Sequence, residues 1–427
     1  MIDLRNTLSP WHQATGWCVA LSGGLDSTVL LHLLAQQPTA PLRALHVHHG
    51  LQAAADAWPA HCQRLCDSLG VPLDIIHVHV APGASLEQGA RDARYAAFAQ
   101  ALRPGELLLT GQHRDDQAET LLFRLLRGAG LRGLSGMPAQ RALGQGSLLR
   151  PLLDTPRDEL LAYATAHGLH WIEDPSNDDT QFSRNYLRHQ VLPALTRRWP
   201  QAARSLARSA AHLAEAQGLL DEVAQQDLAQ ASTPDAFAWL GCPSLDLEVL
   251  RQLSPARQRN ALQYWLAART RLPDTRHWSG WEDVRDAGGE GRPVWRLADG
   301  ELHRSGLRIY WLDAHWLTPP AQPVPWLDPR QPLALPGNGQ LTLSGRLPQG
   351  PLQVRYRQGG ERMAVEGRGH RDLKRLLNER QLPLFARQRV PLLYRDGQLL
   401  AVANLPGLGL ADGQLHWCVP TSAQGLR

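Results

Sequence analysis

Six consecutive residues, Ser22 to Ser27 (Ser-Gly-Gly-Leu-Asp-Ser), constrain the fold of this chain more than any other stretch. The apolar run 17–21 precedes them, and the mostly apolar, helix-like run 28–34 follows. A buried strand that ends in a loop of small residues, from which a helix starts, gathers several backbone N–H groups around one anion. Glycine lets the backbone approach that anion where a Cβ would clash. The order of strand, loop and helix therefore predicts a phosphate cradle, against the alternative of a glycine-rich turn that binds nothing.

The side chains of this loop suit a nucleotide. The serine hydroxyls can donate hydrogen bonds to phosphate, and the carboxylate of Asp26 can hold a metal ion or orient a ligand. No lysine follows the glycines, so the loop is not a Walker A sequence. It resembles the SGGxDS sequence of the PP-loop pyrophosphatases, which split ATP into AMP and pyrophosphate to activate an oxygen atom. This resemblance implies that ATP is bound by Ser22, Gly23, Gly24, Leu25, Asp26 and Ser27.

The first half of the chain predicts an α/β fold with a doubly wound parallel sheet. Short apolar runs alternate with segments of helical periodicity, which is typical of parallel strands joined by crossover helices. The phosphate loop then lies at the carboxyl edge of the sheet, where such folds bind ligands. The expected strands are 17–21, 42–47, 73–80, 106–110 and 148–153, and the expected helices are 26–36, 53–69, 86–102 and one that Thr155 caps, Pro156 starts and Gly168 ends.

The rest of the chain is predicted to form two further domains, since 427 residues exceed what one core usually holds. One long helical pattern covers 200–230, and another helix is expected at 255–268. A proline-rich linker follows at 318–325, and the pattern then turns to short strands around one helix at 372–379. The expected domains are 1–215, a mostly helical 216–325, and a small α+β domain at 326–427.

Positive charge is concentrated near the C-terminus. The whole chain carries a formal charge of +4, but residues 355–395 hold eleven basic and four acidic side chains, hence +7, which leaves −3 elsewhere. Such a concentration favours a polyanionic partner, most often nucleic acid, although a solvated charged face is the common alternative. The same segment contains the single lysine of the chain, Lys374.

The cysteines and the apolar segments indicate the cellular compartment in which the protein works. Five cysteines are odd in number and scattered, which argues against a disulfide framework: Cys18, Cys62, Cys66, Cys242 and Cys418. No charged-then-apolar signal opens the chain, and its apolar runs stop short of the ~20 residues of a membrane span. We therefore expect a cytoplasmic protein. The oligomeric state, with a homodimer among the options, stays open.

A second motif, residues 112–120, follows the fourth expected strand. Asp115 or Asp116 lies four or three residues before Glu119, on one face of a helix at its first turn. Carboxylates at this edge of the sheet can hold Mg²⁺ against a triphosphate or bind an ammonium group. Taken alone, the motif also fits a helix whose acidic start and basic end satisfy the helix dipole. Its register with residues 22–27 favours the site.

Together these blocks make the chain resemble the tRNA(Ile)-lysidine synthases in their long, three-domain form. The resemblance covers nearly the whole chain, with high specificity over 20–190 and a looser match between 230 and 350. The matching segments are 22–32, 46–51, Glu87 with Ala90-Arg91 and Arg94-Tyr95, 112–120, 125–130, 150–153, 171–174, Ser176-Asn177, 184–188, and the C-terminal stretch from Gly367 through Lys374 to Tyr394.

This resemblance implies a reaction in two steps. ATP adenylates the C2 oxygen of the wobble cytidine in an isoleucine tRNA with a CAU anticodon, and pyrophosphate leaves. The ε-amine of free L-lysine then attacks C2, and AMP leaves. Because an ε-ammonium has a pKa of ~10.4, it must lose a proton before it attacks. The target base lies in a single-stranded loop, from which it can enter a pocket at modest cost.

The resemblance also implies roles for particular residues. Catalytic roles fall to Asp26, Asp115, Asp116, Glu119 and Arg188, and the sequence does not say which carboxylate binds or deprotonates lysine. Asp26 and Asp116 are the candidates for Mg²⁺. The expected tRNA contacts are Arg94, Arg184, Arg368, Arg371, Lys374 and Arg375. Methionine tRNA carries the same anticodon triplet, so the domains after residue 215 have a reason to read other parts of the tRNA.

Three other functions compete with this interpretation. A tRNA thiolase on the same fold needs a catalytic cysteine pair or cysteine ligands for an iron–sulfur cluster, and the chain has no C-x-x-C. An RNA-binding protein could use ATP only as a structural ligand, which would leave the four carboxylates of the two motifs without a purpose. An amidating ligase for small molecules would not explain the basic C-terminal segment.

Several other residues are expected to be structural. The histidines at the strand ends, 46–49 and 77–79, could suggest a metal site, but such histidines are more often structural. Cys62 and Cys66 lie one helical turn apart, which favours packing over ligation. The tryptophans Trp265, Trp278 and Trp281 are expected in a core rather than stacked on RNA.

Overall fold

The computed structural model describes residues 2–36, 39–50, 53–80, 86–273, 275–288, 291, 293–320 and 323–420. The chain divides into two compact units, with the division between Leu219 and Leu220. Helix α10 (Ala202–Ala231) crosses this division, as the long helical pattern predicted. The further split of the second unit at residue 325 stays a prediction. None of the described helices is both long enough and apolar enough to span a membrane.

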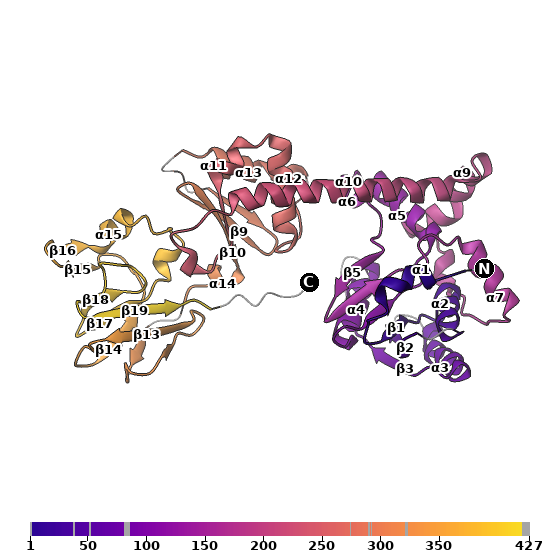
Figure 1. Ribbon diagram of the computed structural model, residues 1–427, viewed down its shortest axis with the longest axis horizontal. Coiled ribbons are helices and arrows are strands. Elements are labelled where there is room, and N and C mark those ends of the chain that lie inside the picture. The colour runs from indigo at the N-terminus through magenta and orange to yellow at the C-terminus, as the bar shows by residue number, and fades with distance from the viewer. Residues whose placement is uncertain are drawn as a thin grey trace. The chain divides into compact units, whose positions relative to one another are not determined.

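The first unit is built on a six-stranded sheet in the order β3-β2-β1-β4-β6-β5 (Figure 1). All neighbours pair in parallel except β5, which pairs antiparallel with β6. This confirms the doubly wound parallel sheet. The strands are β1 (Trp17–Ala20), β2 (Leu42–His48), β3 (Leu73–His77), β4 (Leu107–Leu109), β5 (Gln140–Leu143) and β6 (Gly146–Leu149).

The order of the strands in the sheet determines where the loops of the expected ATP site lie. The chain moves outward from β1 through β2 to β3, and then returns to put β4 on the other side of β1. The loops after β1 and β4 therefore leave the sheet side by side at its carboxyl edge. Ligands of open α/β sheets bind at such a topological switch point.

Side chains that alternate along each strand pack into two hydrophobic cores, one on each face of the sheet. Trp17 and Val19 of β1 pack into one core with Leu30 and Cys62, whereas Cys18 packs into the other core with Phe98. A period of two along a strand covered on both faces produces this division. Cys62 and Cys66 are fully buried in the first core, so their prediction as packing residues is confirmed. The main helices around the sheet are α2 (Leu25–Gln36), α3 (Trp58–Leu69), α4 (Leu86–Ala101), α5 (Arg114–Leu126) and α7 (Arg157–Ala166).

Several details differ from the sequence prediction. The strand expected at 148–153 ends at Leu149, because the chain turns at residues 151–154. Helix α7 starts at Arg157, and Pro156 itself occupies the N-cap position in place of Thr155. Strand β5 was not predicted. The short elements of this unit are α1 (Arg5–Leu8), η1 (Ser9–Trp11), η2 (Ala53–Ala57), α6 (Leu131–Leu134), η3 (Pro175–Asp178), α8 (Ser183–Tyr186), η4 (Leu187–Val191) and α9 (Leu192–Arg198).

The middle region of the second unit is helical, as expected, and also contains an unpredicted antiparallel sheet in the order β7-β10-β9-β8. Trp265, Trp278 and Trp281 are buried in one core between these helices and strands, which confirms their prediction as core residues. The elements are η5 (Ala238–Leu240), β7 (Ser244–Asp246), α11 (Leu247–Gln252), α12 (Pro255–Ala267), η6 (Thr275–Trp278), α13 (Ser279–Asp286), β8 (Val294–Leu297), β9 (Gly300–Ser305), β10 (Arg308–Asp313) and α14 (Ala314–Leu317).

The C-terminal region holds a six-stranded sheet, β11-β14-β17-β18-β15-β16, and a three-stranded one, β12-β13-β19. Helix α15 (Leu373–Glu379) matches the predicted helix, with Asp372 as its N-cap. The remaining elements are β11 (Val324–Trp326), β12 (Leu333–Ala334), β13 (Gln340–Gly345), β14 (Leu352–Arg355), β15 (Arg362–Val365), β16 (Gly369–Asp372), η7 (Ala386–Gln388), β17 (Leu392–Arg395), β18 (Gln398–Val402) and β19 (Gly413–Cys418).

Arg389 is the charged residue that ties the C-terminal region to the segment before it. It is 2 % exposed, and its guanidinium donates to backbone carbonyls of His315, Thr318 and Gly337. Its guanidinium also stacks on Trp316, with Cζ 5.3 Å from the ring centroid. Arg389 is one of the eleven basic side chains counted in the segment 355–395, and the structure shows it to be buried.

Candidate active site

The loop after β1 has the geometry of an anion cradle. Gly23 has φ +86°, and a Cβ there would lie 2.7 Å from Ile172 Cδ1. The hydroxyls of Ser22 and Ser27 are 3.0 Å apart, and the backbone N–H of Gly24 donates to Ser22 Oγ over 3.3 Å. Helix α2 starts directly behind at Leu25. Only glycine fits position 23, and the N-terminus of α2 favours negative charge in front of it.

The loop after β4 packs directly on the first loop. A Cβ on Gly111 would lie 2.9 Å from the carbonyl carbon of Asp26, so only glycine allows this approach. The sequence analysis did not single out Gly111, although its position just after a buried strand was a usable signal. The contact holds residues 22–27 and 112–120 in fixed register.

His113 links the carboxylates of the two loops. It is the N-cap of α5. Its side-chain Nδ1 accepts from the backbone N–H of Asp115, and its backbone N–H donates to Asp116 Oδ2 over 3.1 Å. Because Nδ1 accepts, the proton belongs on Nε2. Nε2 lies 3.6 Å from Asp26 Oδ2 and 3.5 Å from Asp116 Oδ2. The imidazole, 1 % exposed, was missed as a site residue, because capping from a side chain was not considered for histidine.

Arg188 joins the carboxylates along α5. Its Nε donates to Glu119 Oε1 over 2.6 Å, and its Nη2 donates to Glu119 Oε2 and to Asp116 Oδ1 over 3.0 and 3.1 Å. Arg188 lies on the π-helical turn η4, in which the N–H of Leu192 donates to the carbonyl of Leu187. Pro193 follows and has no N–H for the carbonyl of residue 189, which explains the local change of hydrogen-bond register.

Arg184 approaches from the same segment. Its Nη2 donates to Thr120 Oγ1 over 2.8 Å, and its Nε is 3.5 Å from Glu119 Oε2. Asp116 and Glu119 pair with these two guanidinium groups, whereas Asp26 pairs with His113. The three carboxylates therefore outnumber the guanidinium groups that contact them, which leaves an excess of negative charge. The cluster can therefore accept a cation, either an ammonium group or a metal ion.

Burial of the carboxylates strengthens the case for a bound cation. Burial raises the pKa of Asp26, a shift that His113 opposes and Asp116 strengthens. Burial also raises the pKa of Glu119, against the hydrogen bonds from Arg188. Asp26 Oδ1 is buried with no hydrogen-bond partner among the described residues. A bound cation would satisfy a buried carboxylate oxygen that has no hydrogen-bond donor.

The carboxylates of the cluster can supply some, but not all, of the ligands that a divalent cation needs. Asp26 and Asp116 can supply oxygen ligands, as the sequence analysis proposed for Mg²⁺. Within the described parts of the chain, no three His, Cys, Asp or Glu side chains are arranged as a ready metal site. The ion would therefore take its remaining ligands from phosphate and water, which is common for Mg²⁺.

Asp115 and Arg94 lie at the same edge of the sheet with different partners. Asp115 Oδ2 accepts from the N–H of Arg157 over 2.9 Å, so this carboxylate caps α7. Arg94, on α4, is half-buried and has no hydrogen-bond partner among the described residues. Burial lowers the pKa of Arg94, and the charges of Arg91 and Arg184 lower it further.

The predicted tRNA contacts of the C-terminal region gather on β16 and α15. Arg368 and Arg375 both pair with Glu379, at 3.0 and 3.1 Å. Arg371 and Lys374 are exposed. These side chains belong to the second unit.

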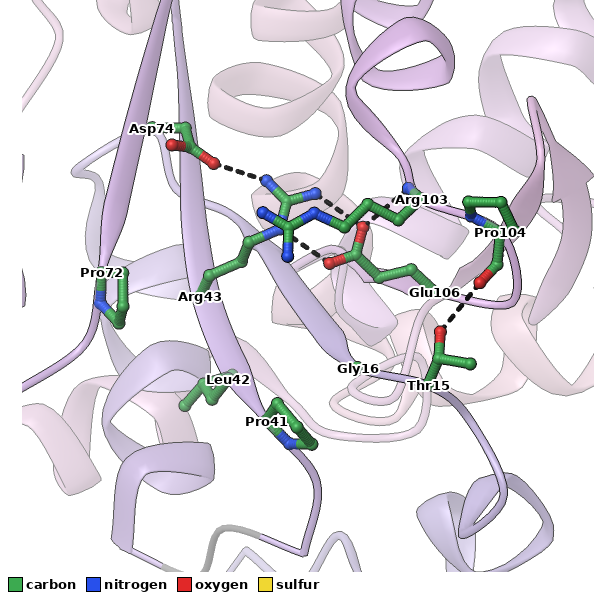
Figure 2. Close-up of a pocket in the computed structure, with 10 residues that line it drawn as sticks. All are labelled: Thr15, Gly16, Pro41, Leu42, Arg43, Pro72, Asp74, Arg103, Pro104 and Glu106. Atoms are coloured by element: carbon green, nitrogen blue, oxygen red, sulfur yellow. Dashed lines mark hydrogen bonds and ion pairs between the residues drawn. The ribbon is translucent and has the colours of Figure 1, made fainter.

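A cavity of about 410 Å³ lies at the opposite edge of the first unit's sheet (Figure 2). Arg43 dominates it and donates to Glu106 through Nε and Nη2 over 2.7 and 2.6 Å, and to Asp74 through Nη1 over 2.7 Å. The charges are mutually satisfied, and the strands begin here rather than end. The cavity is thus a structural ion-pair site, separate from the carboxyl edge.

Three family models match separate parts of the chain. Residues 2–195 match a family model described as a PP-loop domain, residues 245–310 a TilS substrate binding domain, and residues 352–417 a TilS substrate C-terminal domain. A tRNA(Ile)-lysidine synthase of Pseudomonas putida is 67% identical over 98% of this chain and 99% of its own length. The chain belongs to the tRNA(Ile)-lysidine synthases. The Pseudomonas aeruginosa member is 59% identical over 99% of this chain and 98% of its own.

Solved structures are similar over parts of the chain. The U34-tRNA thiolase of Methanococcus maripaludis matches with a TM-score of 0.42 and 20% identity, over 50% of this chain and 77% of that one. A crystal structure of a TILS C-terminal domain matches with a TM-score of 0.19 and 23% identity, over 23% of this chain and 100% of that one.

Proposed function

We propose that the protein is an ATP-dependent ligase that joins free L-lysine to C2 of the wobble cytidine of tRNA(Ile) with a CAU anticodon. Lysidine, AMP and pyrophosphate are the products, and an adenylated cytidine is the intermediate. The observation that carries the proposal is the meeting of the loop 22–27 with the carboxylates of α5, through His113, at the switch point of the sheet. Family membership supports the same reaction.

In the first step the C2 oxygen of cytidine bonds to the α-phosphorus of ATP, and the bond to pyrophosphate breaks. Backbone N–H groups of residues 22–27 and the start of α2 oppose the charge that develops on the leaving pyrophosphate. Asp26 faces this region from the first turn of α2, where Mg²⁺ bound with Asp116 would neutralise phosphate charge.

In the second step the ε-amine of lysine bonds to C2 and the bond to the AMP oxygen breaks. The excess negative charge of the carboxylate cluster favours an ammonium group over a second anion. We assign the binding and deprotonation of this ammonium to Asp116 and Glu119, while Arg188 and Arg184 orient the carboxylates. Asp115 takes a supporting role, because it caps α7.

The cysteines do not favour the thiolase alternative. Burial raises the pKa of Cys62 to about 12 and that of Cys66 to about 11, so both remain thiols at neutral pH. Burial also raises the pKa of Cys18 to about 12. Sulfur transfer needs a thiolate. All five cysteines are free, which agrees with a reducing cytoplasm as the place of action.

The decisive test is the incorporation of labelled lysine into an isoleucine tRNA transcript with a CAU anticodon. We expect labelling that requires ATP, with none of the methionine tRNA control. Release of pyrophosphate on addition of tRNA, without labelling by lysine, would keep the adenylating loop and overturn the proposed nucleophile. Labelling of both tRNAs would overturn the proposed specificity.

Replacing Lys374 by alanine is expected to weaken tRNA binding and leave ATP binding unchanged. Lys374 is exposed beside Arg371 on the β16–α15 surface, so its loss removes a phosphate contact rather than a core contact. The slope of log Kd against log salt should fall by about one. The matched control is Arg330→Ala, an exposed basic residue outside the segment. Equal salt slopes for the two variants would contradict the prediction.

A further inference from the structure

Tyr95 on α4 is surrounded by arginines, of which Arg94 alone was predicted above to contact the tRNA. Arg91 Cζ lies 5.0 Å and Arg141 Cζ 4.8 Å from the centroid of the tyrosine ring. Arg141 comes from β5, whose hairpin packs on α4 so closely that a Cβ on Gly144 would lie 2.2 Å from the carbonyl oxygen of Ala99. The arginines are therefore held at fixed places by two packed elements.

Within the described part of the chain, no carboxylate balances the positive charge of this Tyr95 cluster (Arg91, Arg94, Arg141 and Arg150 around Tyr95). Among the described residues, no ion pair joins any of the four arginines to a carboxylate. Arg150, 4 % exposed, donates to the carbonyl of Pro138, and its Nε is buried without a partner. Burial alone would raise the pKa of Tyr95, but the charges of Arg91, Arg150 and Arg94 lower it.

The geometry of the arginines suits phosphate. A guanidinium that stacks on an aromatic ring keeps its N–H edge free for a planar or tetrahedral oxyanion, and stacking reduces the entropy lost on binding. Arg91, Arg94 and Arg141 are half-buried, so ligands can reach them. Several guanidinium groups so close together, with no carboxylate partner among the described residues, are costly unless an anion joins them.

We propose that the Tyr95 cluster binds backbone phosphates of the RNA strand that flank the base undergoing modification. The proposal rests on the proposed function. It adds Arg91 and Arg141, as principal residues, to the tRNA contacts already predicted for Arg94 and Arg184 in the same unit. Arg184 connects the cluster to the carboxylates, because it contacts Glu119 and acts electrostatically on Arg94. We therefore expect a strand held by the cluster to run toward the groups that act on its base.

The phosphates of ATP are the alternative ligand of these arginines, because they offer the same oxyanions as an RNA backbone. The loop 22–27 already offers ATP a cradle of its own, and the Tyr95 cluster is formed by α4 and β5 rather than by that loop. RNA backbone is therefore the source to which we commit, and separate measurements of ATP and RNA binding distinguish the two.

The test uses the full-length protein with Arg91→Gln and Arg141→Gln, each measured with a CAU anticodon stem-loop RNA and with an ATP analogue that cannot be hydrolysed. Arg103→Gln is the matched control, since Arg103 is an exposed arginine of the same unit at the opposite edge of the sheet. We expect RNA binding to weaken about 5- to 10-fold in each variant, with a salt slope lower by about one. ATP affinity should stay within about twofold of the control.

Equal RNA affinity of the variants and the control would overturn the proposal, and so would a loss confined to ATP. Arg141→Lys keeps the charge but not the bidentate fork, and we expect it to recover part of the affinity and the full salt slope. Melting temperatures equal to that of the control identify an altered surface rather than an altered fold. Because binding is read without turnover, failure of lysine incorporation in the wild type would leave this test intact.

Discussion

Replacing Asp26 by asparagine is expected to lower the rate of lysidine formation by about 10²- to 10⁴-fold without unfolding the protein. The substitution keeps the shape and removes the negative charge that faces His113 Nε2 at 3.6 Å. Losses of this size are typical when a charged group that acts on the transition state is removed. Single-turnover labelling with saturating ATP and tRNA measures the effect.

The melting temperature of the same variant is its control. Asp26 Oδ1 is buried and has no hydrogen-bond partner within the described ranges, so the native carboxylate costs stability that the amide reduces. We expect the variant to melt at or above the wild-type temperature. Full activity would remove Asp26 from the site, and a clear loss of stability would show that its main role is structural.

The largest effect on stability is expected at the other edge of the sheet. Replacing Arg43 by methionine leaves Glu106, which is 4 % exposed, as a buried carboxylate without its bidentate partner (Figure 2). Breaking a buried pair in this way typically costs about 3–5 kcal/mol of unfolding free energy. Removing both charges with Arg43→Met and Glu106→Leu should recover most of the loss. A double variant no more stable than the single one would contradict this account.

The pH dependence of this pair has a definite sign. Burial alone would raise the pKa of Glu106, but the hydrogen bonds from Arg43 bring it below its usual value. The pair therefore stabilises the fold fully above the unfolded carboxyl pKa of ~4.3 and loses this contribution as pH falls through the lower folded value. The difference in unfolding free energy between wild type and Arg43→Met should be largest near neutral pH and shrink below about pH 4.

Local patterns explain what could be predicted from the sequence. A buried strand, Gly23 and the start of α2 are neighbours along the chain, so the loop, its helix and the parallel sheet follow from short-range spacing. The same holds for Asp116 and Glu119, which one turn of α5 brings to one face. Sheet β7-β10-β9-β8 was not predicted, although Asp299-Gly300 at the β8–β9 turn and Gly306 at the β9–β10 turn were usable hairpin signals.

Tertiary contacts explain what could not be predicted. Gly111 matters only because the backbone of Asp26 is against it, and no pattern in the sequence measures that distance. His113 gains its place from two carboxylates on different loops. Arg188 reaches α5 from 69 residues away, through a turn whose hydrogen-bond register Pro193 alters.

Arg389 decides where the C-terminal region could be cut and transplanted. A fragment that begins at the predicted boundary, residue 326, would lack the carbonyls of His315 and Thr318 that this guanidinium needs, together with the ring of Trp316. It would carry a buried charge with most of its acceptors gone. A portable module therefore has to begin upstream of Asp313, whose side chain caps α14, so that the module brings its own anchor.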